Sequence, residues 1–253
     1  MQEKASRKRV AETGYAETYP VRDIFIRESG YIMKSLVSQD EKIQAYRLRY
    51  RIFYEELAWV PRSGSLLEID EYDKYTASLG IFDRQHVLVA CTRVALPGTP
   101  FMIEKEFSSL ISPFHKIRKQ NDIAEISRSC VAPEARKLSV YGTFGACRVF
   151  TLIYKVAYQW CSANNIRYVY TVVEPRLYRV LRAQGFRMQL VGEPVTMPDG
   201  CVAMAAIIDW DEFVSVNAAR RPEFAEWFTH YGSTRYEGQR LQPGSYSQPQ
   251  VSP

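Results

Sequence analysis

The stretch that decides the fold is Glu134-Ala-Arg-Lys-Leu-Ser-Val-Tyr-Gly142-Thr-Phe-Gly145, which leads into a longer segment, Ala146 to Ser162. In the longer segment the apolar residues recur at three- and four-residue intervals, and they are Val149, Ile153, Val156, Ala157 and Trp160. That spacing predicts a helix with one buried face. The basic, glycine-containing stretch before it is predicted to be a loop that ends at the helix N-terminus. Free N–H groups at a helix N-terminus attract anions, so the loop is a candidate anion site.

One helix and three strands are predicted before this loop. Residues 41–57 carry apolar side chains at helical spacing, after the cap candidates Ser38 and Asp40. Residues 58–67 are expected to form a loop. Residues 75–82 and 86–96 alternate in polarity around a polar turn at 83–85, which predicts two antiparallel strands. Residues 123–132 predict a further strand that ends at Pro133.

The segments after the loop predict two helices, a strand and a hairpin. The helix of residues 146–162 ends at Asn164-Asn165, and residues 166–173 form a nearly continuous apolar strand. A short basic helix is expected over 175–184, followed by a hairpin over 186–208 that turns at Pro198-Asp199-Gly200. This order predicts an α/β fold, with a mixed, mostly antiparallel sheet and helices on both faces. It matches the GNAT-like (acyl-CoA N-acyltransferase) architecture. The alternative is another α/β fold, in which Gly142 and Gly145 only turn the chain.

Length and composition indicate one globular domain. The chain has 253 residues, of which 46% are hydrophobic and 24% charged. We expect a flexible arm over residues 1–21, a single domain over 22–230 and a disordered tail over 231–253, because the tail is rich in Gln, Pro, Gly and Ser. The longest apolar run, Val202 to Ile208, is too short to span a membrane, and the charged N-terminus does not resemble a secretory signal. A cytoplasmic location is expected.

Charge and motif content narrow the possible functions. The net charge of +5 suits a nucleic acid, an anionic protein or an anionic cofactor, but the basic residues are spread and no nucleic-acid recognition motif is present. Five irregularly spaced cysteines predict reduced core thiols. The three histidines lack metal-ligand spacing, so neither a metal nor a permanently bound cofactor is expected. The common hydrolase, NTPase and dinucleotide motifs are missing from the sequence.

Two charged clusters are candidates for the functional site. The first contains Glu68, Asp70 and Asp73, and the second is Glu125-Ile-Ser127-Arg128. In a regular strand Glu125 and Ser127 face one side and Arg128 the other, unless a bulge re-aims it. Arg93, in the middle of another strand, is a natural partner for the acidic cluster. The clusters indicate either a buried ion network that fixes a loop to the sheet or a pocket with an electrophile and a base.

Together these residues resemble the acyl-homoserine-lactone synthases, also called autoinducer synthases. The likeness covers about residues 30–210, and it is carried by Arg49-x₃-Phe53-x₅-Trp59, Glu68-x-Asp70-x₂-Asp73, Arg93, Phe107 and Glu125-x₂-Arg128. The resemblance implies a GNAT-like enzyme that moves a fatty acyl chain from acyl carrier protein, sometimes from coenzyme A, to the amine of S-adenosylmethionine. Lactonisation then releases methylthioadenosine.

The resemblance also implies roles for individual residues. Arg49, Phe53 and Trp59 would belong to a mobile N-terminal part that closes over S-adenosylmethionine, and Phe107 would shape the substrate pocket. Glu68, Asp70, Asp73 and Arg93 would form a polar network, with Glu125 and Arg128 at the reaction centre and Ser127 beside them. Phosphopantetheine would bind at Arg136, Lys137, Gly142 and Gly145. The aromatic residues could equally be ordinary core or loop anchors.

Chemistry suggests how these groups would act. Glu125 would be the base that takes a proton from the acceptor amine, Arg128 would hold the acceptor carboxylate, and the acidic cluster would attract the sulfonium cation. The arginine row Arg176, Arg179 and Arg182 could meet the acidic surface of acyl carrier protein, or could be a solvated helix face.

Two alternatives to a lactone synthase stay open. The segment Val173-Glu174-Pro175 and the following residues look more like a sister group, the N-acyl amino acid synthases and exosortase-associated acyltransferases, which acylate a free amino acid. A non-catalytic acyl-binding protein of GNAT-like fold would keep the ion network only for stability.

Overall fold

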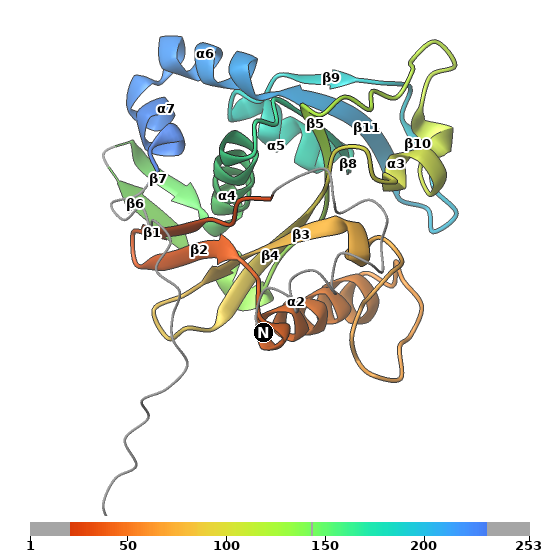
Figure 1. Cartoon of the computed structure of the whole chain (residues 1–253), viewed down its shortest axis with the longest axis horizontal. Coiled ribbons are helices and arrows are strands. Elements are labelled where there is room, and N and C mark those ends of the chain that lie inside the picture. Colours follow the sequence, from red (N-terminus) through yellow and green to blue (C-terminus); the bar gives the residue numbers. More distant parts are fainter. Residues whose placement is uncertain (1–20, 143, 232–253) are drawn as a thin grey trace, which may run out of the picture.

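A nine-stranded sheet with helices on both faces forms the body of the protein in the computed structural model, which describes residues 21–142 and 144–231 (Figure 1). The strand order is β1-β2-β3-β4-β5-β8-β11-β10, and β9 also pairs with β11. Among the strands of the described residues, β5 and β8 are the one parallel pair. Helices α2 and α4 cover opposite faces of the sheet. The predicted mixed, mostly antiparallel sheet is therefore confirmed.

The N-terminal half of the sheet contains the three predicted strands and one hairpin that was not predicted. The predicted strands are β3 (Thr76–Phe82), β4 (Leu88–Ala95) and β5 (Ile123–Val131). The additional hairpin consists of β1 (Phe25–Glu28) and β2 (Tyr31–Ser35). Two short helical segments, α3 (Met102–Lys105) and η3 (Ser108–Leu110), lie between β4 and β5.

The predicted helix over 41–57 is two helical segments. Helix α2 (Gln39–Tyr50) begins at Ser38, whose hydroxyl accepts the Glu41 N–H while the Glu41 carboxylate accepts the Ser38 N–H. This reciprocal pair satisfies N–H groups that the first helical turn leaves free. The chain then continues without a break into η1 (Arg51–Glu56), a segment of π-helix.

The segment that decides the fold contains a hairpin where a loop was expected. After the turn η4 (Pro133–Ala135), strands β6 (Ser139–Gly142) and β7 (Gly145–Arg148) pair with each other, and α4 (Val149–Ala163) begins only at Val149. The prediction that the glycine loop leads directly into the helix is therefore wrong. An extended backbone allows Val140 to be buried, and Gly142 and Gly145 pair at the hairpin end, where Gly145 has φ +95°.

The C-terminal half follows the predicted order and then adds two helices. Its elements are β8 (Tyr168–Val173), α5 (Pro175–Ala183), β9 (Met188–Leu190), β10 (Val195–Thr196), β11 (Val202–Asp209), α6 (Trp210–Arg220) and α7 (Pro222–Thr229). The turn before β11 contains Gly200 at φ +84°, as predicted. The predicted apolar face of α4 is fully buried.

One buried lysine ties three distant elements together. Lys155, on α4, has no exposed surface, and its Nζ lies 2.7 Å from Glu28 Oε2 on β1 and 2.6 Å from the Trp227 carbonyl oxygen on α7. The carboxylate and the carbonyl replace the water that the ammonium group loses on burial. The edge hairpin and the last helix are thus both fastened to α4.

The sheet opens where β5 and β8 part. Their parallel pairing runs from Ile123–Tyr168 to Ile126–Thr171, whereas β5 continues to Val131. Beyond Ile126, β5 keeps only its partner β4. The backbone of residues 127–131, which includes Arg128, therefore has no strand partner on the β8 side.

The proposed terminal segments are almost wholly outside the described residues. Of the predicted arm and tail, only Val21 and Tyr231 lie within them, so the predicted domain boundaries stay predictions. No helix within residues 21–142 and 144–231 is long and apolar enough to cross a membrane.

Candidate active site

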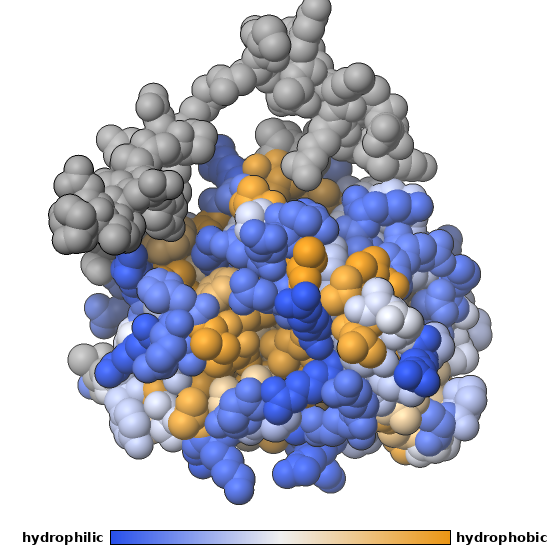
Figure 2. All heavy atoms as spheres, turned by 90° about the horizontal axis from the view of Figure 1, so that it is seen from below, coloured by the Kyte–Doolittle hydropathy of each residue, from blue (hydrophilic) through white to orange (hydrophobic). Residues whose placement is uncertain are grey.

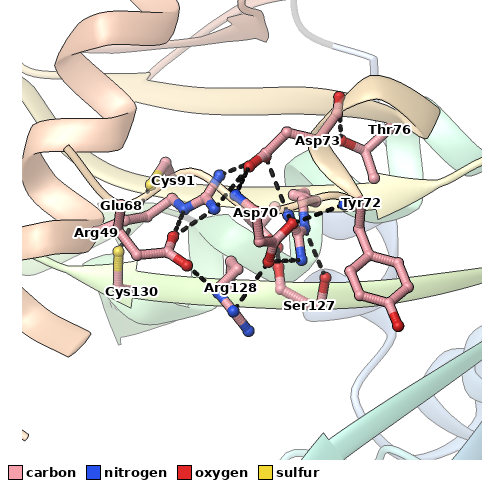
Figure 3. A network of polar contacts seen from close by, with 12 residues as sticks. Arg49, Glu68, Asp70, Tyr72, Asp73, Thr76, Cys91, Ser127, Arg128 and Cys130 are labelled. Carbon is pink, nitrogen blue, oxygen red and sulfur yellow. Dashed lines mark hydrogen bonds and ion pairs between the residues drawn. The ribbon is translucent and has the colours of Figure 1, made fainter. Parts of the chain in front are cut away.

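Three arginines and three carboxylates meet on the α2 side of the sheet (Figure 3). The arginines come from separate elements, α2, β4 and β5, and the carboxylates from the segment between η1 and β3. The six residues of this ion network are Arg49, Glu68, Asp70, Asp73, Arg93 and Arg128. The predicted pairing of Arg93 with the acidic cluster is therefore present, and Arg128 of the second cluster joins it.

Arg49 joins helix α2 to the acidic segment. Its Nη1 lies 2.6 Å from Asp73 Oδ1, and its Nη2 lies 3.1 Å from Asp73 Oδ2. It also donates to the Glu68 carboxylate. Because Arg49 is only 2% exposed, its guanidinium belongs to the ion network and does not face open solvent.

Arg93 is the centre of the ion network. It donates to both Asp70 oxygens, at 2.5 and 2.8 Å, and lies 3.0 Å from Asp73 Oδ1. Its Nε donates to Ser127 Oγ at 3.0 Å, which connects β4 to β5 through side chains. A forked guanidinium can serve all of these acceptors at once, which the single ammonium group of a lysine cannot do.

A bulge in β5 brings Arg128 to the same side as Arg93. The register pairs Arg93 with Ser127 and Cys91 with Cys130, so Arg128 and Ser129 together oppose Thr92. Arg128 has φ +53°, a left-handed conformation that is uncommon for a residue with a side chain. Its Nε then reaches Glu68 Oε1 and its Nη2 reaches Asp70 Oδ2, both at 2.9 Å.

The formal charges of the ion network cancel. Its three carboxylates are balanced by three guanidinium groups, so the network as a whole carries no excess negative charge, and the attraction of the acidic cluster for a sulfonium cation stays a prediction. Most of the network is sealed, and only the side chains of Asp70 and Arg128 are appreciably exposed, at 20% and 16%. Those two groups are the edge that a substrate can reach.

The two aspartates stay ionised. Burial alone would raise the pKa of Asp70, but the hydrogen bond and positive charge of Arg93 outweigh burial and lower it. The pKa of Asp73 is lowered in the same way by Arg49, against the effect of burial. The network therefore persists as ion pairs at neutral pH.

Glu125 lies in a different environment, only three residues from Arg128. It is 1% exposed, and its carboxylate accepts the N–H groups of Met102 (2.6 Å) and Ile103 (2.8 Å) at the start of α3. Burial raises its pKa to about 7, although the two N–H groups favour the ionised form. The start of α3 covers this carboxylate.

Met102 connects Glu125 with the ion network and was missed by sequence reasoning. Its N–H binds Glu125, while its Sδ lies 3.0 Å from Arg93 Nη2 and 3.5 Å from Arg128 Nη1. A methionine at the start of a short helix, after a proline-containing loop, carries no local signal of such a role. Only the tertiary fold reveals it.

An aromatic pair lies over the exposed edge of the network. Phe53, on η1, stacks with Trp59 at a centroid distance of 6.2 Å, and the Arg128 guanidinium lies 5.6 Å from the Phe53 ring centroid. Trp59 is 38% exposed. The predicted association of these aromatic residues with the site is thus present in the geometry, whereas their mobility stays a prediction. On this α2 side, apolar atoms line a hollow that hydrophilic residues border (Figure 2).

Phe107 lies outside the ion network. It is partly buried against a second apolar cluster that includes Ile103, Leu110 and Tyr170. Its N–H donates to the Met102 carbonyl oxygen at 3.2 Å, so it supports the short helix that covers Glu125. Its role in shaping a substrate pocket stays a prediction.

The four residues predicted to receive phosphopantetheine do not form a helix N-terminal loop. Gly142 and Gly145 pair at the end of the β6–β7 hairpin. Arg136 is paired with Glu56 at 2.5 and 2.7 Å, and Lys137 offers its carbonyl oxygen to Arg148. Arg136 is therefore engaged in an exposed ion pair, and the N-terminus of α4 lies at Arg148 and Val149, so the binding of phosphopantetheine by these four residues stays a prediction.

A cavity of about 700 Å³ lies beside that helix N-terminus and shares no residue with the ion network. It is lined by the hairpin, the end of α5 and the start of α7, through residues such as Phe144, Arg148, Gln184, Arg221 and Phe224. Among the residues that the structure describes, no group of His, Cys, Asp and Glu could hold a metal ion.

A sheet that parts beside a polar site is the arrangement that the sequence analysis expects of a GNAT-like acyltransferase. Comparison with known proteins gives the family: the profile described as "Autoinducer synthase" matches residues 33–216, and the chain belongs to that family. The acyl-homoserine-lactone synthase of Acinetobacter nosocomialis is 27% identical over 169 residues, covering 66% of this chain and 90% of that protein. The synthase of Rhizobium radiobacter is 29% identical over 159 residues, covering 61% and 72%.

Solved structures share the fold. A structure titled as a CoA-dependent acyl-homoserine lactone synthase, BjaI, with SAM and isopentyl-CoA has a TM-score of 0.63 at 23% identity, covering 80% of this chain and 89% of that chain. FeeM, an N-acyl amino acid synthase from uncultured soil microbes, has a TM-score of 0.55 at 16% identity, covering 75% and 96%. The GNAT-like fold is thus confirmed, and the protein is an acyltransferase of the autoinducer synthase family.

Proposed function

We propose that the protein transfers a fatty acyl group from acyl carrier protein to the amine of S-adenosylmethionine and closes the product to an N-acyl-homoserine lactone. The observation that carries this proposal is the exposed Asp70–Arg128 edge, which lies below Phe53 and Trp59 and beside the point where β5 and β8 part. An acceptor amine and a donor thioester can meet there.

The acceptor would bind as an ion at this edge. A free amino acid or S-adenosylmethionine carries an ammonium group and a carboxylate, which match Asp70 and Arg128. The sulfonium and adenine groups would contact the faces of Phe53 and Trp59, because a cation is attracted to an aromatic face. In this arrangement the sulfonium group is stabilised by the faces of Phe53 and Trp59, and no excess of negative charge is needed.

The acyl transfer needs a neutral amine. The amine attacks the thioester carbonyl, a C–N bond forms, the C–S bond breaks and the thiolate leaves, while the amine proton passes to a base. Glu125 would accept this proton through a water molecule, since each carboxylate oxygen retains a second lone pair and its pKa of about 7 suits a base at neutral pH. Met102 would orient Glu125 relative to Arg93 and Arg128.

The lactone would close without a second base. The carboxylate oxygen of the acylated product attacks the carbon attached to the sulfonium, a C–O bond forms, and the C–S bond breaks with its electron pair on sulfur. Methylthioadenosine is a neutral leaving group, so no further proton transfer is required. The protein only has to hold the chain folded back on itself, which the Arg128–Asp70 edge would do.

The donor would be acyl carrier protein docked on α5. Arg176, Arg179 and Arg182 are exposed, and none has an ion-pair partner within the described part of the chain. Charge reversal at two of these arginines is expected to raise KM for acyl carrier protein at least fivefold and to leave KM for acyl-coenzyme A within twofold. Equal effects on both donors would contradict docking on this helix.

An N-acyl amino acid synthase is the second candidate function. The fold similarity to FeeM and the charge-neutral ion network both favour it, since a neutral network offers no net attraction for the extra cation of S-adenosylmethionine. Under this function the acceptor is a free amino acid and the product stays open.

Incubation with each acceptor separates the two functions. Purified protein is mixed with acyl carrier protein carrying C6 to C14 chains and either S-adenosylmethionine or an amino acid mixture, and products are identified by mass spectrometry. Methylthioadenosine release with a lactone product is expected, and an open N-acyl amino acid would support the second candidate. Arg128→Ala should lose the product, and Arg167→Ala, in an exposed ion pair with Asp209, should keep it. No product from either acceptor would contradict both functions.

A further inference from the structure

Two ion pairs outside the ion network connect η1 to the turn that follows β5. Arg51 donates through Nη1 and Nη2 to the two Glu134 oxygens, both at 3.0 Å. Arg136 donates in the same two-pronged way to Glu56, at 2.5 and 2.7 Å. Each segment supplies one cation and one anion, so the four side chains form a reciprocal clamp between residues about 80 positions apart in the sequence.

The clamp brackets Phe53. Arg51 and Glu56 are the first and last residues of η1, and Phe53 lies between them. On the other side, Arg136 also donates from Nε to the Val131 carbonyl oxygen, 3.1 Å away at the end of β5. The clamp thus ties both ends of the π-helix to the strand that carries Arg128.

The π-helical turn η1 is an uncommon conformation. Such turns are rare in proteins and are frequently found at functional sites. Here the turn leads to Ala58, at φ +54°, and to Trp59, whose N–H binds the Phe53 carbonyl oxygen at 2.7 Å. The orientation of the aromatic pair therefore depends on how η1 is held.

We propose that Arg51, Glu56, Glu134 and Arg136 are positioning residues, which hold Phe53 and Trp59 over Arg128 and so set the affinity for the acceptor. The effect on affinity rests on the proposed function of the aromatic pair. Both ion pairs are exposed, so each one stabilises the held position by a factor of about five at most, and salt weakens it. The aromatic pair is therefore held in position by the clamp, but it can be released.

Tryptophan fluorescence tests this clamp without any substrate. Trp59 is 38% exposed, whereas Trp160, Trp210 and Trp227 are buried and the chain has four tryptophans in all, so acrylamide quenching reports mainly on Trp59. Arg51→Glu places two acids opposite each other and should raise the quenching constant about twofold. The exchange R51E/E134R restores opposite charges and should return the constant to the wild-type value.

Steady-state kinetics then tests the effect on the acceptor. R51E should raise KM for the acceptor three- to tenfold with kcat within twofold, and R51E/E134R should recover most of the loss. The matched control is Arg167→Glu, which breaks an equally exposed two-pronged pair with Asp209 at the start of α6. It should change neither the quenching nor KM.

The outcomes separate this inference from the proposed function. Unchanged quenching in a folded R51E variant, or failure of the exchange to restore it, would overturn the clamp. If quenching follows the charges while no acyl transfer is found with any acceptor, the clamp holds and the proposed function fails. A melting temperature measured for every variant excludes general unfolding as the cause.

Discussion

Glu125 and Arg128 are three positions apart on β5 and occupy opposite electrostatic environments. Glu125 faces backbone N–H groups inside an apolar layer, where burial raises its pKa to about 7. Arg128 lies between the carboxylates of Glu68 and Asp70, which accept hydrogen bonds from its guanidinium group. The same short motif thus supplies one group that can exchange a proton and one that stays an ion, as acyl transfer to an amine requires.

The raised pKa of Glu125 predicts a specific pH dependence of stability. Because the folded value lies above the ordinary value of 4.5, protonated Glu125 stabilises the fold fully below about pH 4.5, and this contribution disappears as the pH rises through about 7. The wild type should lose about 3 kcal/mol of unfolding free energy relative to Glu125→Gln between pH 4.5 and 8. Urea unfolding of both proteins across this range measures the difference.

Comparing the wild type with Glu125→Gln removes the contributions of other titrating groups to the pH dependence of stability. Asp70 and Asp73, whose pKa values are lowered, titrate below their ordinary range and leave this window unaffected. His115 contributes equally to both proteins. Parallel stability curves for wild type and Glu125→Gln would show that folding leaves the pKa of this carboxyl group unchanged and would contradict the prediction.

At the scale of single residues, the sequence predicted which charged groups would meet but not what surrounds them. Glu68, Asp70, Asp73 and Arg93 could be grouped because charges in or beside apolar strands need partners. Met102 could not, since a thioether carries no charge pattern. The neutrality of the ion network was missed because Arg49 was assigned to the substrate and not to the carboxylates.

At the scale of elements, the bulge in β5 is the feature that completes the site. A regular strand would place Arg128 on the face opposite to Ser127, as the period of two predicts. The bulge was anticipated only as an exception, because its cause is the register between β4 and β5 and not the residues of β5 alone.

Glycine substitution tests the strain at this bulge. A left-handed backbone destabilises a residue with a side chain by about 1 kcal/mol and has little cost for glycine. Arg128→Gly should therefore be about 1 kcal/mol more stable than Arg128→Ala. Guanidinium chloride unfolding measures both variants. At Ser129, which does not have a positive φ, the order should reverse, with Ser129→Ala more stable than Ser129→Gly. The same order at both positions would show that the bulge relaxes.

The β6–β7 hairpin shows where element prediction failed. Its apolar spacing continues smoothly into α4, so the pattern alone could not separate strand from helix at 146–148. The hairpin is fixed by distant contacts, above all by Phe144, whose ring lies 4.1 Å from that of Trp227 on α7. Such contacts are invisible from local sequence.

At the scale of the whole molecule, the order of the central elements was predictable, but the terminal elements that pack on α4 were not. The alternation of strands and helices gave the mixed sheet correctly. The hairpin β1–β2 and the helices α6 and α7 were missed, because their periodic segments are short and their stability comes from packing on α4.

Substitution of Lys155 tests how strongly the packing of the terminal elements on α4 depends on the ion pair with Glu28. Lys155→Met leaves the partly buried Glu28 carboxylate with its hydrogen bond from Ser29 and should cost about 2 kcal/mol of unfolding free energy, because the carboxylate has then lost its cation. The double variant K155M/E28Q removes both charges and should recover at least half of that loss. Urea denaturation provides the measurement. A double variant as unstable as the single one would assign the loss to packing.

The charge balance of the ion network also limits how this protein can change over generations. Three cations and three anions share one largely buried network, so replacing any one of them by a neutral residue leaves a charge in the network without its counterpart. A single step away from the present set is therefore costly, and a second step that removes an opposite charge repairs it. In related lineages these six positions should be exchanged in compensating pairs, or not at all.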